Sequence, residues 1–216
     1  AAALGLAPAA VQPMTDIELV YRTAFAPGEG VVLYAGTGSI AAFVDADGTM
    51  PRAGGRGAVI DDAGGGHWIG RRALRQIWRA EDAEPGAWRH SPLARRVFER
   101  IGGIDWAQTR HWVYNGPGAA RGEMGLLALA VAAAADEDAA ALALLQAAGA
   151  ELARLALAMR QRFGPLPLAL AGRVFELHPA IELGLRQALP AGSAMRRLAL
   201  PAHHAAARLA ARHPTP

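Results

Sequence analysis

The chain has 216 residues, of which 22 are basic, 19 are acidic and 52% are apolar, so it is long enough for one or two domains with a sizeable core. The absence of cysteine excludes a disulfide framework, a cysteine-ligated iron–sulfur cluster and a thiolate zinc site. All basic residues are arginine, and a net charge of +3 over the whole chain is too small to indicate a nucleic-acid-binding protein.

The N-terminal segment is rich in alanine and has no basic region, so it does not resemble a secretory signal peptide. Charged residues or helix breakers interrupt every apolar run before it reaches 18 residues, which predicts a protein with no membrane partner. We therefore expect a cytoplasmic protein. Residues 11–15 could form a strand, but no partner strand precedes them, which is typical of the tail of a preceding unit.

Short apolar runs bounded by glycine and proline predict three consecutive strands, at residues 31–35, 40–44 and 50–53. Apolar residues then recur three and four apart, which predicts helices over residues 68–80, 92–101, 106–114, 124–135 and 138–163. The last part of the chain is predicted to hold a strand at 166–171, a helix at 179–189, a strand at 195–200 and a helix at 205–212. This order predicts one α/β lobe (βββαβαβα) with a helical insertion near residues 75–163.

A loop of four small residues, Gly36, Thr37, Gly38 and Ser39, directly follows the first predicted strand. Its two glycines allow a tight turn that points successive N–H groups and two hydroxyls at one place, as binding of an anionic phosphate requires. With Ala41 the letters also fit G-x-G-x-x-A, but that dinucleotide-binding fingerprint needs a helix next, and strand-like residues follow instead. An ordinary glycine-rich hairpin turn is the alternative.

Residues 54–57 (GGRG) and 61–70 (DDAGGGHWIG) form a second glycine-rich stretch. Such a stretch is costly to order, and loops of this kind usually occur where the backbone comes close to a ligand. The adjacent carboxylates Asp61 and Asp62 would suit sugar hydroxyls. The alternatives are that Asp62 caps the following helix or that the loop is simply solvated.

Residues 31–74 carry both glycine clusters in order, and they resemble the C-terminal lobe of the BadF/BadG/BcrA/BcrD ATPase family, in particular its N-acetylglucosamine kinases. The similarity runs from about residue 11 to the C-terminus, with a weaker match at residues 166–175 (LPLALAGRVF). The resemblance implies an actin-like, ribonuclease-H-like fold whose two lobes close over ATP. It further implies that residues 1–16 are the last strand of a first lobe absent from this chain, and that residues 17–216 form the C-terminal lobe.

The resemblance also implies a catalytic residue and a phosphate loop. In these kinases an aspartate at the end of the first lobe takes the proton from the sugar hydroxyl, and Asp16 occupies that place. Asp16 also precedes a predicted helix at residues 18–26, so it could be the N-cap of that helix as well. Residues 36–39 match the family's second phosphate loop, which would hold the phosphates of ATP.

Other matched positions divide between the sugar and the nucleoside. The residues implied on the sugar side are Gly55, Asp62 and His67. The residues implied on the nucleoside side are Ala171, Gly172 and Arg173, at the start of the adenosine motif. Mg²⁺ would arrive with the nucleotide. No dedicated protein metal site is predicted, because the histidines are scattered and the adjacent pair at 203 and 204 would point about 100° apart on a helix.

Several positions depart from the family pattern: Arg56 replaces a tryptophan, Asp61 a glycine, Ala63 a glutamate, Gly65 a serine and Arg173 the second adenosine glycine. The Ala63 departure removes a carboxylate expected in the sugar pocket, and the Arg173 departure adds a cation that could weaken or redirect adenosine binding. The branch of the family that activates acyl-CoA reductases and dehydratases holds an iron–sulfur cluster on cysteines, so a chain without cysteine does not fit it.

The predicted function is therefore ATP-dependent phosphoryl transfer to an amino-sugar hydroxyl. The implied partners are a small-molecule sugar and ATP, without nucleic acid, and a homodimer is one possible assembly. Because phosphoryl transfer needs positioning and charge neutralisation from both sides of the nucleotide, we expect little kinase activity from this chain alone. The alternative is a non-catalytic sugar- or nucleotide-binding remnant of the same family, for which Ala63 and Arg173 are the signs.

Overall fold

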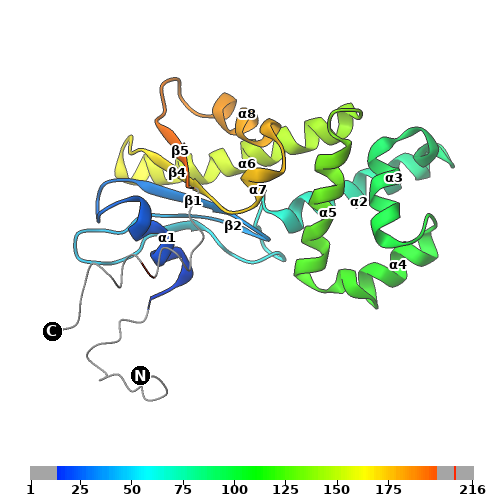
Figure 1. The fold of residues 1–216 in the computed structure, drawn as a ribbon, viewed down its shortest axis with the longest axis horizontal. Helices are drawn as coiled ribbons and strands as arrows, with labels where there is room; N and C mark the ends of the chain where they lie inside the picture. Colours follow the sequence, from blue (N-terminus) through cyan, green and yellow to red (C-terminus); the bar gives the residue numbers. More distant parts are fainter. Residues whose placement is uncertain (1–13, 199–206, 208–216) are drawn as a thin grey trace, which may run out of the picture.

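A computed structural model of the chain describes residues 14–198 and residue 207. Its centre is a five-stranded sheet in the order β3-β2-β1-β4-β5 (Figure 1). The strands β1 (Val31–Ala35), β2 (Ser39–Ala42) and β3 (Arg52–Gly54) are antiparallel neighbours. The strands β4 (Leu168–Ala171) and β5 (Met195–Arg197) continue the sheet parallel to β1. The chain thus has a mixed α/β fold, as predicted.

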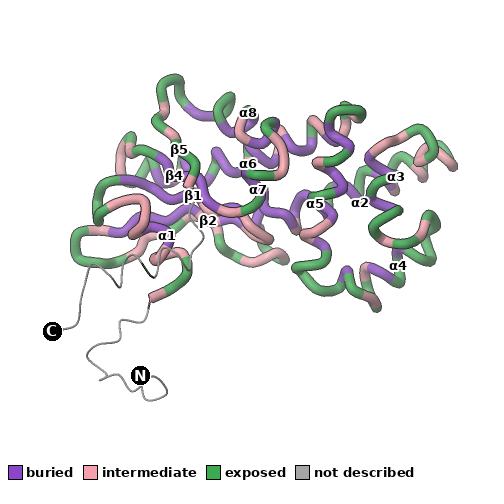
Figure 2. The backbone as a smooth tube through the Cα atoms, viewed as in Figure 1, coloured by how far each residue is buried: buried purple, intermediate pink, exposed green. Residues whose placement is uncertain are grey.

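The central strands are continuous apolar runs because both of their faces are covered. Side chains alternate between the two faces, so Val31, Leu33 and Ala35 of β1 enter the large core, while Val32 enters a smaller cluster on the other face. Helix α1 (Asp16–Ala24) closes that smaller cluster with the buried side chain of Tyr21. Figure 2 shows the buried backbone concentrated along the sheet and the helices that flank it.

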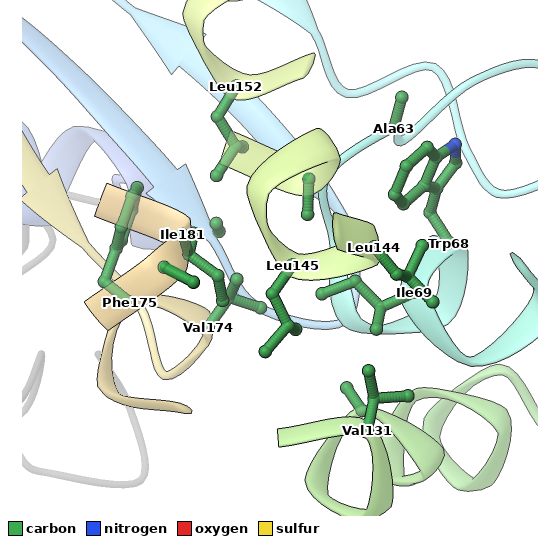
Figure 3. Packing of buried hydrophobic residues seen from close by; sticks show 14 of the residues in the cluster. Ala63, Trp68, Ile69, Val131, Leu144, Leu145, Leu152, Val174, Phe175 and Ile181 are labelled. Carbon is green, nitrogen blue, oxygen red and sulfur yellow. The ribbon is translucent and has the colours of Figure 1, made fainter. Parts of the chain in front are cut away.

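The large core lies between the sheet and the remaining helices. Helix α6 (Ala139–Phe163) packs against β1, β2 and β3 and crosses α8 (Pro179–Ala188). Its buried side chains meet those of neighbouring helices in one cluster, in which Figure 3 labels Ile69, Val131, Leu144, Leu145, Leu152 and Ile181. Although α6 falls inside the predicted helical insertion, its packing makes it part of the layer that covers the sheet.

Four further helices extend away from the sheet (Figure 1): α2 (Gly66–Ala83), α3 (Pro92–Ile101), α4 (Trp106–Tyr114) and α5 (Arg121–Ala134). Two short 3-10 turns, Ala87–His90 and Pro117–Ala119, connect them. Within this group, α2 and α5 pack together most extensively. The first turns of both helices lie next to the loop after β1, so this packing positions the site described below.

The start of α1 differs from the prediction. The helix begins at Asp16 rather than at residue 18, and Thr15 is its N-cap, because the Thr15 hydroxyl accepts a hydrogen bond from the Glu18 N–H at 3.2 Å. The alternative that Asp16 is the N-cap was therefore wrong. The strand expected at residues 11–16 is also not found where it can be checked: residues 11–13 lie outside the described part, and Met14 and Thr15 are not in a strand.

Near the other end, α7 (Val174–Leu177) was not predicted, and the last predicted helix, residues 205–212, lies outside the described residues except for position 207. Helix α6 is long and apolar enough to cross a membrane by length and composition, with a mean hydropathy of 1.4 over its most apolar window. Half of that window is buried inside the fold, as in the core helix of a globular domain.

Candidate functional site

A cleft of about 570 Å³ lies beside the turn that joins β1 to β2. Its lining includes the start of α1 with Asp16, the turn with Thr37 to Ser39, and the loop that holds Gly55 and Asp62. The structure therefore brings the predicted base, most of the predicted phosphate loop and two predicted sugar-side residues to one cavity. We call it the first cleft.

Asp16 lies at the mouth of the first cleft, in the first turn of α1. Its side chain is exposed, and Oδ1 accepts a hydrogen bond from the Ile17 N–H at 2.8 Å. Among the described residues, no cation pairs with this carboxylate. Asp16 is thus free to accept a proton or a hydrogen bond from a molecule in the cleft.

In the turn after β1, some of the hydrogen-bond donors are already bonded to carbonyl groups of the protein. The Gly36 N–H donates to the Gly38 carbonyl at 2.9 Å, and the buried Ser39 hydroxyl donates to the Ala63 carbonyl at 2.7 Å. The predicted role of Ser39 as a hydroxyl donor to phosphate therefore does not fit this structure. Within the described part of the chain, the N–H groups of Thr37 and Gly38 and the Thr37 hydroxyl donate to no protein acceptor. These three donors are available to an anion.

The second glycine cluster packs directly against this turn. The Gly66 N–H donates to the Gly36 carbonyl at 2.8 Å, and the His67 N–H donates to the Thr37 carbonyl at 3.0 Å. A Cβ on Gly65 would lie 2.7 Å from the Gly38 Cα, closer than real side chains approach. The two glycine clusters are therefore parts of one site, and the position that departs from the family's serine has no room for a side chain.

Asp62 is held by a cation that was not predicted. It is 2% exposed, has a φ of 59°, and accepts a hydrogen bond from the Gly57 N–H at 3.2 Å. The Arg121 guanidinium, from the first residue of α5, forms an ion pair with the Asp62 carboxylate. The Arg121 side chain is 49% exposed and lines the first cleft. Asp62 is not the N-cap of α2, because Gly65 takes that position.

A second ion pair fixes the same loop to the core helix. The Asp61 carboxylate accepts a hydrogen bond from the Arg154 guanidinium of α6 at 2.7 Å, and Arg154 also contacts Glu151 at 3.2 Å. The adjacent Ala63 side chain is buried in the core, where Figure 3 shows it beside Trp68. The position where the family has a glutamate therefore packs inward in this chain.

His67, which was predicted on the sugar side, does not share a cleft with the phosphate loop. His67 lines neither the first cleft nor the second cleft described next. Burial and the nearby guanidinium groups of Arg71 and Arg121 lower the pKa of His67, so that the ring is neutral at pH 7. Because His67 lines neither cleft, the prediction that it faces the sugar has no support from the lining of the clefts.

A second cleft of about 270 Å³ is also lined by residues of the turn, Gly36 and Thr37. Its polar lining includes Thr37, Glu123 and Arg173. Its apolar lining comes from α5 and α7 and consists of Leu126, Ala128, Leu129, Val174 and Leu177. Thr37 lines both clefts, so the turn is adjacent to the cleft that contains Asp16 and to the cleft that contains Arg173.

Of the three residues predicted on the nucleoside side, only Arg173 lines the second cleft. Ala171 is buried in β4. Gly172 has a φ of 96°, and a Cβ there would lie 2.7 Å from the Ala35 carbonyl carbon, so glycine is needed for the backbone to pass the end of β1. Gly172 thereby sets the direction in which α7 and Arg173 leave the sheet.

The chain matches a family model and several solved structures. The model of the BadF/BadG/BcrA/BcrD ATPase family matches residues 17–188. A structure from Chromobacterium violaceum, described provisionally as an N-acetylglucosamine kinase, is 30% identical with a TM-score of 0.66 and covers 84% of this chain and 59% of its own. A second, from Porphyromonas gingivalis and described in the same way, is 20% identical with a TM-score of 0.63, over 86% of this chain and 60% of its own. The chain thus spans less than two thirds of either structure, and no curated protein matches it significantly.

Proposed function

The chain belongs to the BadF/BadG/BcrA/BcrD ATPase family, and from this membership we propose that it binds ATP and an amino sugar as one lobe of an N-acetylglucosamine kinase-like enzyme. The observation that carries the proposal is that Asp16, Thr37 and Gly38 line the same cleft, while the N–H groups of Thr37 and Gly38 have no protein acceptor in the described part of the chain. A carboxylate close to a phosphate-binding turn is what phosphoryl transfer to a hydroxyl needs.

In this proposal the first cleft takes the sugar and the terminal phosphate. The Asp16 carboxylate orients the attacking hydroxyl and accepts its proton as the hydroxyl oxygen bonds to the γ-phosphorus and the bond to the β-phosphate breaks. The donors of Thr37 and Gly38 fit the phosphate, because they have no protein acceptor in the described part of the chain. Mg²⁺ that comes with the nucleotide would neutralise charge on the phosphates.

The second cleft would take the nucleoside. Its walls, from α5 and α7, are mostly apolar, as the flat face of an adenine requires, and Arg173 also lines it. Because Thr37 lines both clefts, a nucleotide that occupies the second cleft can extend its phosphates past Thr37 toward Asp16. On the sugar side, Gly55 and Asp62 line the first cleft and are the groups proposed to face the sugar.

The strand order and the covering helices support a further proposal, that residues 17–216 form a ribonuclease-H-like lobe with a helical insertion and that residues 1–16 end a preceding lobe. A second lobe of the actin-like type would close over the same clefts and supply the other half of the phosphate contacts. A cytoplasmic location, a homodimer, and the absence of membrane or nucleic-acid partners stay predictions.

Calorimetric titration of the chain with ATP, ADP and N-acetylglucosamine tests the proposal. We expect nucleotide and sugar to bind with positive coupling, each raising the affinity for the other, because the two would meet at Thr37 and Asp16. Binding of the sugar alone would favour the non-catalytic remnant, for which the buried Ala63 is the supporting observation. Failure of every ligand to bind would contradict both.

A further inference from the structure

We infer that Arg121 is a further phosphoryl-binding residue of this site and contacts the terminal phosphate of the nucleotide. The inference rests on the proposed function and adds to it a cation that the sequence did not indicate. It depends on where the guanidinium lies, on what it contacts and on how many of its donors are free.

Arg121 lies at the border between the two clefts. Its own side chain lines the first cleft, whereas the next two residues along α5, Gly122 and Glu123, line the second. Thr37 is the residue that lines both. A phosphate chain that runs from the nucleoside to the sugar must cross this border, and it would pass Arg121 as it does so.

The guanidinium also lies directly against the proposed phosphate turn. A Cβ on Gly38 would overlap the Arg121 Nη2 atom and would lie 2.7 Å from the Asp62 Cγ. The charged group is therefore adjacent to the backbone whose N–H groups, at Thr37 and Gly38, have no protein acceptor among the described residues. Backbone donors and a guanidinium on one spot form a combination that binds phosphate strongly.

The hydrogen bonds of Arg121 leave it able to bind a ligand. A guanidinium has five N–H donors, and in the described part of the chain only Nη2 donates, to Asp62. Asp62 is almost fully buried and is also bound by the Gly57 N–H, so it fixes the direction of the guanidinium. The remaining donors are on a side chain that is 49% exposed and lines the first cleft.

The competing explanation is structural: Arg121 could serve only to neutralise the buried Asp62. In that case its removal would disturb the loop of Asp62 and the turn of Gly38 together, and every nucleotide would lose affinity to the same degree. A contact with the terminal phosphate instead predicts a loss for ATP that ADP does not share. The ratio of the two affinities separates the explanations.

The experiment is calorimetric titration of the chain with ATP and with ADP, for the unmodified protein and for Arg121→Ala. We expect Arg121→Ala to weaken ATP binding by about tenfold or more, the usual effect of losing a hydrogen bond between charged groups, and to change ADP binding by less than about twofold. Arg110→Ala, which removes an exposed arginine of α4 that lines neither cleft, is the matched control and should change neither affinity.

Equal losses for ATP and ADP, or no loss for either, would overturn the inference and leave the proposed function standing. Failure of the unmodified chain to bind either nucleotide would contradict the proposed function and the inference with it. If Arg121→Ala does not fold, because Asp62 is left buried without a partner, the double variant Asp62→Asn and Arg121→Met removes both charges. The same selective loss of ATP affinity is expected from it, relative to Asp62→Asn alone.

Discussion

Gly65 lies so close to Gly38 that a Cβ on Gly65 would be 2.7 Å from the Gly38 Cα and 2.8 Å from the Thr37 carbonyl oxygen. The N-terminal end of α2 therefore supports the proposed phosphate turn from behind, together with the hydrogen bonds from Gly66 and His67 to the carbonyls of residues 36 and 37. The shape of the turn depends on a residue in the other glycine cluster.

Gly65→Ala is expected to displace this turn. The added methyl group must push backbone rather than a flexible side chain, so we expect a loss of about 1–3 kcal/mol in the free energy of unfolding and a weaker affinity for both ATP and ADP. The measurements are denaturant unfolding and calorimetric titration. Gly192→Ala, at a φ of 78° in a loop remote from the clefts, serves as the control, because it should lose stability through strain but keep nucleotide affinity. An unchanged affinity in Gly65→Ala would contradict the dependence of the turn on this contact.

Asp16→Asn is expected to weaken sugar binding without affecting the nucleotide. An amide is a weaker acceptor than a carboxylate, so a sugar hydroxyl that bonds Asp16 should lose affinity by about three- to tenfold, measured calorimetrically with ADP present. ADP affinity itself should not change, since Asp16 does not line the second cleft. Glu18→Gln removes a carboxylate from the same helix that lines neither cleft, and sugar affinity should be kept in that variant. Equal sugar affinity in Asp16→Asn and the unmodified chain would argue against Asp16 as the hydroxyl-binding group.

Much of the fold could be predicted from local pattern, because the pattern and the packing agree. The run at Val31–Ala35 is apolar throughout and is buried on both faces, and the lengths of the long helices follow their apolar spacing. Helix α7 has four residues, which is too few for a helical period to be seen. At the start of α1 the local signal was ambiguous, since Thr15 and Asp16 are both good N-cap residues and the structure uses Thr15.

The site was predictable only in part, because some of its properties come from contacts distant in sequence. The glycine clusters indicated the positions that line the first cleft. Arg121 gave no signal, since it reaches Asp62 only through the packing of α5 on α2, across 59 residues of sequence. From the sequence, the hydroxyls of Ser39 and Thr37 were equally good candidates to bind phosphate. In the structure the Ser39 hydroxyl donates its hydrogen bond to the Ala63 carbonyl instead.

Turnover by this chain alone is expected to be well below about 1 s⁻¹, the lower end of typical kinase values. In the proposed site the described residues would contact the nucleotide from one side only. Neutralising the charge of the phosphates needs protein groups on both sides of the nucleotide. A steady-state assay with ATP and N-acetylglucosamine measures this. Turnover near 1 s⁻¹ or faster would show that the groups of this chain suffice.

The carboxylate of Asp138 links the start of α6 to the start of α3 and should make stability depend on pH. It caps α6 through the Ala140 N–H at 2.9 Å, and it accepts hydrogen bonds from the Leu93 N–H at 2.9 Å and the Ser91 hydroxyl at 3.0 Å at the start of α3. Burial alone would raise the pKa of Asp138, but these hydrogen bonds outweigh it and lower the pKa below its ordinary value.

Because the pKa of Asp138 is lower in the folded than in the unfolded chain, its stabilising effect is complete above the unfolded value of about 3.9 and is lost as the pH falls through the folded value. At pH 7 we expect Asp138→Asn to lower the free energy of unfolding by about 1–2 kcal/mol, a modest figure since the carboxylate is partly exposed. Below about pH 4 the unmodified chain should approach the variant. Denaturant unfolding of both proteins between pH 3 and pH 8 measures this, with the exposed Asp82→Asn as the control that should stay close to the unmodified chain. A constant difference between Asp138→Asn and the unmodified chain across that range would mean that the ionised carboxylate does not supply the stabilisation.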